Sequence, residues 1–255
     1  MAPATPRSAS PPKRDSRRKA LDCAAQSHQN GATLAVEQCP LARARKPRVR
    51  DRHSEAEQAR LNILEIAAQE FADKGLAGAR VDEIADKINS SKRMIYYYFG
   101  GKEELYRAVL EAAYAKIRTR EAAANYEAMR SDEALKQYVG HTFDYHAEHP
   151  EFVRLVMNEN IHYGAHIGAV PGLKERNYSV IATLQAILTK GAKEGRFRAG
   201  LDPVELHMLV SSLCFYNVSN RYTFAANFGV DMGSPKVARR RRELIIDAIL
   251  RFCLK

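Results

Sequence analysis

From Ser54 to the end of the chain, apolar residues recur at intervals of three and four positions, the spacing of one face of an α-helix. The first two segments carry them at Leu61, Leu64, Ala68 and Phe71, and then at Val81, Ile84, Ala85 and Ile88. No convincing series of alternating apolar and polar residues, which would indicate strands, is present. A chain with this pattern buries its apolar faces by packing helix on helix, so the sequence predicts an all-α fold.

Capping residues and prolines mark the ends of the expected helices. Ser54 with Glu57 forms a candidate capping box for the first helix, and Gly75 is its candidate C-cap. Pro203 follows Asp202 and Pro235 follows Ser234, so each proline occupies the first position of a capped helix. About nine helices are predicted: a short one within 92–99, and the others at about 54–74, 81–88, 103–126, 132–148, 151–163, 173–194, 203–227 and 235–254.

The first 52 residues differ in composition from the rest of the chain. They hold 12 Lys and Arg against 4 Asp and Glu, and six of the ten prolines lie in the first 47 residues. Large apolar residues are few there, so residues 1–52 are predicted to be a disordered basic tail. Such a tail is either an arm that touches DNA without sequence preference or a dispensable extension, and both interpretations stay open.

The stretch NSSKRMIYYYFGGKEEL, residues 89–105, contains five consecutive β-branched or aromatic residues from Ile95 to Phe99. By propensity alone it would be a strand. Its context favours a helix, because a short predicted helix ends at Asn89, a residue that tolerates positive φ, and Ser90 or Ser91 can cap a second helix. Two short helices joined by a tight polar turn form a helix-turn-helix.

Wound as a helix, this stretch separates two sets of side chains. Ile95, Tyr98 and Phe99 fall on one side and suit packing against the two preceding helices. The other side offers cations, a thioether and a phenol, which suit guanine edges, thymine methyl groups and phosphate oxygens. These residues are Lys92, Arg93, Met94 and Tyr97. The sequence therefore predicts a recognition helix for the major groove of DNA, with Tyr98 in the core and Tyr96 either packed or in contact.

Residues 54–105 closely resemble the N-terminal DNA-binding domain of TetR-family transcriptional regulators. The family's hallmark runs roughly G-V-S-K-G-T-L-Y-H-Y-F-x-S-K-E-E-L, and residues 89–105 follow it, with Asn89 for the turn glycine and Gly101 for the capping serine. The preceding ARVDEIADKI and LNILEIAAQEFADKGLAGA match the family's first two helices. The resemblance implies contacts at or near the bases from Lys92, Arg93, Met94 and Tyr97, and phosphate contacts from Arg80, Ser91, Tyr96 and Lys102.

The resemblance also implies how the chain is divided. A helix-turn-helix domain at 53–102 is followed by an effector-binding and dimerisation domain at 103–255. TetR-like proteins form homodimers through their last two helices, here about 203–227 and 235–254, as a four-helix bundle. The apolar residues on these two helices belong either to that interface or to the core of one subunit, and both readings stay open. They are Leu206, Leu209, Val210, Leu213, Leu244, Ile245, Ala248, Ile249 and Phe252.

The segments HPEFVRLVMNENIHYGAH and LDPVELHMLVSSLCFYNVSNRYTF most resemble regulators of nitrogen-heterocycle catabolism, such as repressors of pyrimidine or nicotinate breakdown. Side chains in this part of the chain that suit a small polar aromatic ligand form the predicted effector pocket. They are Asn158, His162, Tyr163, Tyr178, Phe215, Tyr216, Asn217 and Asn220. No metal site or cofactor is predicted, because the histidines, including His162 and His166, lack a third ligand at a compelling spacing.

Together these features predict a homodimeric repressor that binds a palindromic operator in double-stranded DNA. It leaves the operator when a small effector binds, and aromatic and heterocyclic compounds are the candidate effectors. An activator or dual regulator is the alternative within this class. A helical enzyme and a scaffold with a vestigial DNA reader are rivals from other classes, but no catalytic constellation supports an enzyme. No apolar run is long enough to cross a bilayer, and the expected location is the cytoplasm, on the nucleoid when DNA is bound.

Overall fold

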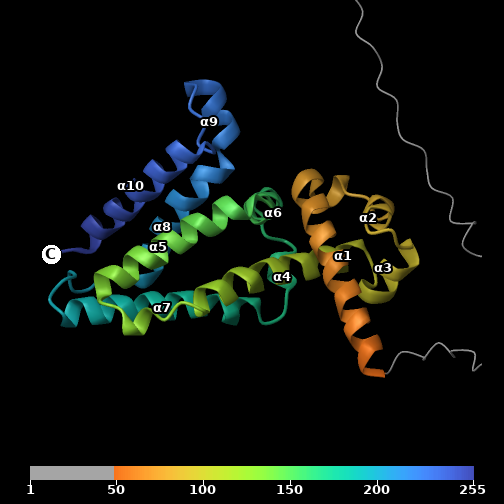
Figure 1. The fold of residues 1–255 in the computed structure, drawn as a ribbon, viewed down its shortest axis with the longest axis horizontal. Helices are drawn as coiled ribbons and strands as arrows, with labels where there is room; N and C mark the ends of the chain where they lie inside the picture. The colour runs from red at the N-terminus through yellow and green to blue at the C-terminus, as the bar shows by residue number, and fades with distance from the viewer. Residues whose placement is uncertain (1–48) are drawn as a thin grey trace, which may run out of the picture. The chain divides into compact units, whose positions relative to one another are not determined.

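A computed structural model describes residues 49–255 of the chain (Figure 1). Within this range all regular structure is helical, apart from an isolated β-bridge between Phe197 and Leu254, and the predicted all-α fold is confirmed. The helices are α1 (Val49–Gly78), α2 (Val81–Lys87), α3 (Lys92–Phe99), α4 (Lys102–Ala122), α5 (Ser131–Glu148), α6 (Pro150–Ile161), α7 (Leu173–Lys193), α8 (Pro203–Ser219), α9 (Arg221–Phe228) and α10 (Pro235–Cys253), with short 3₁₀ turns η1 (Tyr126–Ala128) and η2 (Ile167–Ala169).

The first helix starts earlier than predicted. Its backbone is helical from Val49, so Ser54 lies inside α1 and the expected N-cap at that position is wrong. The physical reason is that neither glycine nor proline separates Pro47 from Ser54, so nothing in the sequence stops the helix there. The predicted break at Gly75 is confirmed, because this residue has the non-helical φ of 67° and interrupts the regular helix. The predicted basic tail lies, up to residue 48, outside the described residues.

The first three helices and the start of α4 share one apolar core. Phe71, Ile84, Ile95 and Leu105 are fully buried in it, one from each of the four helices. The ring of Phe71 meets the ring of Tyr106 edge to face with centroids 5.0 Å apart, a favourable aromatic geometry. Because α2 and α3 each bury one face in this core, the orientation of α3 relative to α1 and α2 is fixed.

A buried carboxylate ties α1 to α2. The side chain of Glu70 is only 1% exposed. It forms an ion pair with Lys74 at 2.5 Å on the same helix, and it accepts a hydrogen bond from Lys87 of α2 at 2.5 Å. Burial alone would raise the pKa of Glu70, but the two lysine contacts outweigh it and lower the pKa to about 2. The carboxylate is therefore charged at neutral pH and fixes the spacing between the first two helices.

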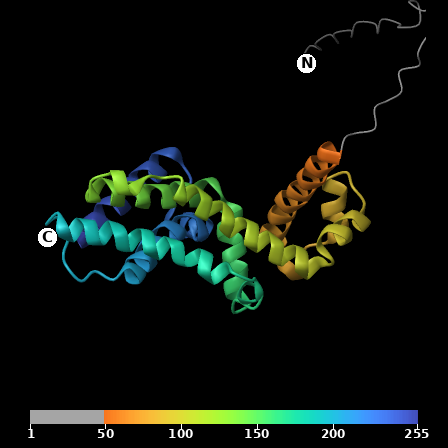
Figure 2. The ribbon, with the colours of Figure 1, turned by 90° about the horizontal axis from the view of Figure 1, so that it is seen from below.

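The remaining helices form a second core. Leu135 of α5, Leu184 of α7, Val210 of α8 and Ile249 of α10 are fully buried there. The helix α4 contributes to both regions, because Leu105 near its start lies in the first core and Ile117 near its end packs with Tyr145 and other residues of the body. Figure 2 shows α4 as one uninterrupted helix along this path.

The predicted helix at 203–227 is two helices. The helix α8 ends at Ser219, Asn220 has the non-helical angles φ −105° and ψ 5°, and α9 follows as far as Phe228. The side-chain amide of Asn220 donates to the Ser219 hydroxyl at 2.8 Å, where the two helices are separated. The part of the chain described thus has ten α-helices rather than about nine, and none of them is long and apolar enough to cross a membrane.

Candidate functional site

The turn between α2 and α3 has the geometry predicted for a helix-turn-helix. Asn89 adopts φ 51°, the left-handed conformation that a glycine would otherwise supply. Ser91 is the N-cap of α3, although its side chain makes no capping hydrogen bond. Residues 92–99 are helical, so the strand that propensity favours does not form. The burial of Ile95 against α1 and α2 is the tertiary contact that overrides propensity.

The three consecutive tyrosines of α3 lie in three environments. Tyr97 is 78% exposed, Tyr96 is exposed to a lesser degree, and Tyr98 is half-buried and packs against the first core. The rings of Tyr97 and Tyr98 meet edge to face at 5.3 Å, which fixes the direction in which Tyr97 projects. Only Ile95 is buried among the eight residues of this helix, so most of its surface is available to a partner.

The structure brings the eight predicted DNA-contacting residues onto three adjoining elements. Arg80 is the N-cap of α2, five of the others lie on α3, Ser91 caps it, and Lys102 opens α4. Seven of the eight are exposed and Lys102 is partly so. Lys92 pairs with Asp82 at 2.9 Å, and Lys102 donates to the carbonyl of Ala77 at 3.3 Å. The hydrogen bond to Asp82 raises the pKa of Lys92, so this ammonium is charged at neutral pH.

The eight predicted effector residues do not form one pocket. Asn158 donates to the carbonyl of Phe71, at the contact between α6 and α1. His162 and Tyr163 are exposed after the end of α6, Tyr163 by 98%. Tyr216 is exposed on α8, Asn217 is buried on the same helix, and Asn220 separates α8 from α9. Tyr178 and Phe215 line two neighbouring cavities, described next.

The inner cavity lies among α4, α5, α6 and α8 and has a volume of about 170 Å³. Aromatic and aliphatic side chains form most of its wall, with several polar groups among them. Its lining residues are Tyr114, Ile117, Arg118, Glu121, Thr142, His146, Phe152, Val156, His207, Ser211 and Phe215. A side cavity of about 320 Å³ reaches Tyr178 and Asn177 on α7 and shares Tyr114, Arg118 and His207 with the inner cavity.

The polar groups of the inner cavity are held in fixed contacts. Arg118 Nη1 lies 2.6 Å from Glu121 Oε2, and the two side chains are only 14% and 12% exposed. Burial raises the pKa of the Glu121 carboxyl to about 7, although Arg118 opposes the shift. His207 Nδ1 lies 3.2 Å from the hydroxyl of Tyr138, and burial lowers the pKa of His207.

Sequence reasoning missed Arg118, Glu121 and His207 as cavity residues. An Arg and a Glu three positions apart on a helix usually form an exposed ion pair, so their spacing alone does not indicate a cavity. A signal was present, because Arg118 follows Ile117 and lies four positions after Tyr114, on a side of the helix that is otherwise apolar. A charged residue on the apolar side of a helix indicates a buried polar site.

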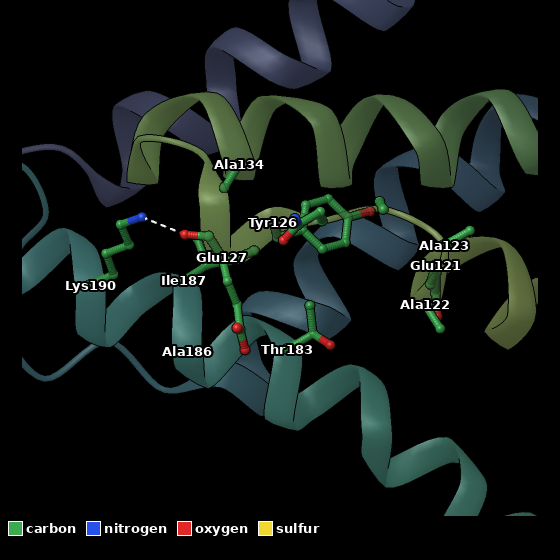
Figure 3. Close-up of a pocket in the computed structure, with 12 residues that line it drawn as sticks. Glu121, Ala122, Ala123, Tyr126, Glu127, Ala134, Thr183, Ala186, Ile187 and Lys190 are labelled. Atoms are coloured by element: carbon green, nitrogen blue, oxygen red, sulfur yellow. Dashed lines mark hydrogen bonds between the residues drawn. The ribbon is translucent and has the colours of Figure 1, made fainter.

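Glu121 also borders an outer cleft of about 550 Å³, formed by the end of α4, the η1 turn, α5 and α7 (Figure 3). Lys190 crosses one end of the cleft and donates to the carbonyl of Glu127 at 2.8 Å. Tyr126, on the η1 turn, is buried against the body, and its hydroxyl lies 3.2 Å from His141 Nδ1. Glu121 therefore lies at the wall that the outer cleft and the inner cavity have in common.

Acid is expected to destabilise the fold through His146. This side chain is buried between the rings of Phe152 and Phe215, and burial lowers its pKa to about 4. Because the folded-state pKa lies below the usual 6.5, the unfolded state binds more protons, so the stabilisation is complete above pH 6.5 and is lost as the pH falls towards 4. The loss is about 3 kcal/mol per chain.

Urea unfolding from pH 7 to pH 4, at fixed protein concentration, measures this effect. His146→Gln should remove the corresponding part of the pH slope, whereas His162→Gln, at an exposed position, should leave the slope unchanged. Equal slopes in the wild type and His146→Gln would show that His146 is not the group that titrates.

Two family models match the chain. The model described as "Bacterial regulatory proteins, tetR family" matches residues 63–109, which include α2 and α3. The model described as "Tetracyclin repressor-like, C-terminal domain" matches residues 132–249, from α5 into α10. The two matches fall on the helix-turn-helix region and on the body with its inner cavity.

Curated relatives and solved structures agree with these models. The HTH-type transcriptional repressor NicS of Pseudomonas putida is 33% identical over 200 residues, covering 78% of this chain and 94% of the relative. The HTH-type transcriptional repressor SCO4008 of Streptomyces coelicolor is 39% identical over 113 residues, covering 44% of this chain and 54% of the relative. The crystal structure of the putative transcriptional regulator SCO4942 of Streptomyces coelicolor superposes with a TM-score of 0.58 at 26% identity, covering 76% of this chain and 98% of that one.

NicS and SCO4008 are transcriptional repressors, and the similarity to NicS extends over nearly its whole length. The recognition-helix geometry, the two family models and the relatives agree with one another. The chain therefore belongs to the TetR family and is a DNA-binding regulator of transcription rather than an enzyme.

Proposed function

We propose that this protein is a repressor that binds a palindromic operator as a homodimer and is released by a small effector in the inner cavity. The observation that carries the proposal is the surface of α3, where Lys92, Arg93, Met94 and Tyr97 are all exposed while Ile95 anchors the helix. A helix held by one side and free on the other is what insertion into a major groove requires. NicS and SCO4008 are repressors, which supports repression rather than activation of transcription by this protein.

In this proposal the contacts divide between bases and phosphates. Lys92, Arg93 and Met94, in the first turn of α3, approach base edges, and Tyr97 follows one turn later. Arg80, Ser91, Tyr96 and Lys102 flank them and bind phosphates, which fixes the register of the helix on the duplex. The ion pair of Lys92 with Asp82 is half-exposed, so the lysine exchanges it for DNA at little cost.

Homodimerisation is proposed through α8 and α10. Of the apolar residues on these helices, Leu206, Val210, Ile245 and Ile249 are buried within one subunit and serve as its core. Other large apolar side chains on the same two helices are exposed and form what we call the dimer face: Val204, Met208, Tyr216, Leu244 and Phe252. Burying these side chains against a second copy would remove them from water, at roughly 1.5–3 kcal/mol for each fully buried side chain.

The helix α4 provides the proposed route from effector to DNA. Lys102 and Leu105 at its start adjoin α3 and the first core, while Tyr114, Arg118 and Glu121 at its end line the inner cavity. A ligand that changes the packing of residues 114–121 therefore acts on the same rigid element that supports the recognition helix. A coupling of about 1–3 kcal/mol changes operator occupancy roughly 5- to 150-fold.

Selection of duplexes from a random DNA library by the full chain tests the proposal. The expected product is an inverted repeat whose half-sites are centred about 10 base pairs, or a multiple of that, apart. Transcription from a promoter carrying the selected site should fall when the protein is present, and a rise would instead identify an activator. Recovery of no enriched sequence would contradict the proposed function.

A further inference from the structure

The inner cavity has the size and walls of a site for a single aromatic ring. Its volume of about 170 Å³ is close to the ~150 Å³ of an engineered apolar cavity that takes up benzene in another protein. The ring of His146 is stacked on Phe152 with an angle of 16° between the planes, and Phe215 meets His146 edge-on at 5.9 Å. The rings of Tyr114 and Phe152 form a T-shaped pair with centroids 5.3 Å apart. These aromatic walls favour a flat ligand.

Arg118 gives the cavity a group that can bind an anion. Arg118 brings a guanidinium that is always protonated, and Nε of this group is buried without a hydrogen-bond partner among the described residues. His146 Nδ1 is also buried and unpartnered. Burial lowers the pKa of both His146 and His207, so these side chains are neutral at pH 7 and add hydrogen-bonding groups rather than charge. A planar carboxylate can accept two parallel hydrogen bonds from a guanidinium.

Glu121 is the carboxylate that an anionic ligand would have to replace. Its Oε2 atom forms an ion pair with Arg118 Nη1 at 2.6 Å, and the side chain lies at the wall shared with the outer cleft. The other titratable or charged groups around the two cavities that Glu121 lines come from four further elements. They are Tyr126 and Glu127 on η1, Tyr138 and His146 on α5, Lys190 on α7 and His207 on α8.

We propose that the inner cavity binds a single-ring aromatic monocarboxylate, whose carboxylate replaces Glu121 as the partner of Arg118 while Glu121 takes up a proton from solvent. Above the pKa of Glu121, the site before binding holds one guanidinium cation and one carboxylate anion. After binding, it holds the guanidinium, the ligand carboxylate and a neutral Glu121, so its net charge is unchanged. The inference rests on the proposed function in treating the bound molecule as the effector.

The protonation of Glu121 agrees with its surroundings. Burial already raises its pKa to about 7 while Arg118 is beside it. Loss of the Arg118 contact and the arrival of a second carboxylate both raise this pKa further, because each disfavours the charged form. Near pH 7 the uptake should therefore be roughly half a proton per site, and it should increase towards one proton at pH 8.

The binding experiment uses the full chain with a panel of single-ring acids: benzoate, the three hydroxybenzoates and the three pyridinecarboxylates. At least one acid should raise the melting temperature at millimolar concentration, and its neutral carboxamide should bind about 10- to 150-fold more weakly, as expected for the loss of a charged hydrogen bond. Arg118→Met should weaken the acid by a similar factor. Arg120→Met, two residues further along the same helix and outside the cavity lining, should not.

Calorimetry of the tightest acid in buffers of different ionisation enthalpy measures the proton. Uptake should increase from pH 6 to pH 8 in the wild type and disappear in Glu121→Gln, which should still bind the acid. The inference is overturned if no acid in the panel binds, if acid and carboxamide bind equally, or if Glu121→Gln retains the full uptake. The carboxamide comparison uses the wild type, so it remains decisive even if Arg118→Met fails to fold.

Operator selection separates this inference from the proposed function. A chain that selects an inverted repeat but binds none of the acids retains its function and loses the inference. A chain that binds an acid through Arg118 but selects no DNA retains the cavity chemistry, and the proposed function fails. If both hold, addition of the acid should lower the affinity for the selected duplex.

Discussion

Replacing Tyr97 with alanine is expected to weaken binding to the selected operator by at least about 30-fold. A side-chain contact to DNA is worth roughly 1–3 kcal/mol, and a dimer loses it twice. Tyr97 is 78% exposed, and its ring touches Tyr98 only at an edge, so truncation should leave the core of the domain unchanged. Lys92→Ala should have an effect of similar size, with a smaller dependence of affinity on salt if its contact is to phosphate.

Fluorescence anisotropy with a labelled duplex measures the affinity, and thermal unfolding and sedimentation show whether fold and assembly are intact. Tyr222→Ala is the matched control, because Tyr222 on α9 is also a largely exposed tyrosine and lies outside the helix-turn-helix. It should bind the operator like the wild type. Unchanged affinity in both Tyr97→Ala and Lys92→Ala would show that α3 is not the reading element.

Leu244→Asp is expected to convert the dimer to monomers at micromolar concentration and to weaken operator binding by at least about 100-fold. Leu244 is 53% exposed in the isolated subunit and belongs to the dimer face. In an interface with two-fold symmetry, the substitution places two carboxylates in apolar surroundings, and unpaired buried charge is strongly unfavourable. A monomer can bind only one half-site of the operator, so it also loses the gain in affinity that comes from binding two half-sites together.

Analytical ultracentrifugation measures the assembly, and anisotropy measures the DNA affinity. Ile161→Asp provides the matched control, since Ile161 is an equally apolar and still more exposed residue at the end of α6. It should remain dimeric and bind DNA normally. A dimeric Leu244→Asp, or a wild type that is monomeric while binding its palindrome tightly, would refute the proposed interface.

The helix-turn-helix was predictable because its signals are local. Asn89 at the turn, the spacing of Ile95 and Tyr98, and the glycine at position 75 each describe a conformation of a few neighbouring residues, and each agrees with the structure. The division at Asn220 was missed, although Asn and Thr near that position weaken a helix, because the apolar pattern continues through Tyr222 and Phe224. Hydrophobic spacing identifies that a helix exists better than it identifies where the helix ends.

The cavity was not predictable in the same way. The set Asn158, His162, Tyr163 and Tyr216 was selected for side-chain chemistry, but whether such groups converge depends on how α6, α7 and α8 pack. Arg118 and His207 are 89 positions apart in the chain and line the same cavity. Contacts of that range follow from the tertiary fold, and a single sequence gives no direct indication of them.

The single buried residue of α3 bears on how such a regulator acquires new targets. Ile95 holds the helix in place, whereas positions 92, 93, 94 and 97 face outward and are not part of the core. Exchanging these four side chains together should redirect the protein to a different operator with little loss of folding stability. A duplicated gene could therefore diverge in the promoters it controls while its descendants keep the same scaffold and the same effector.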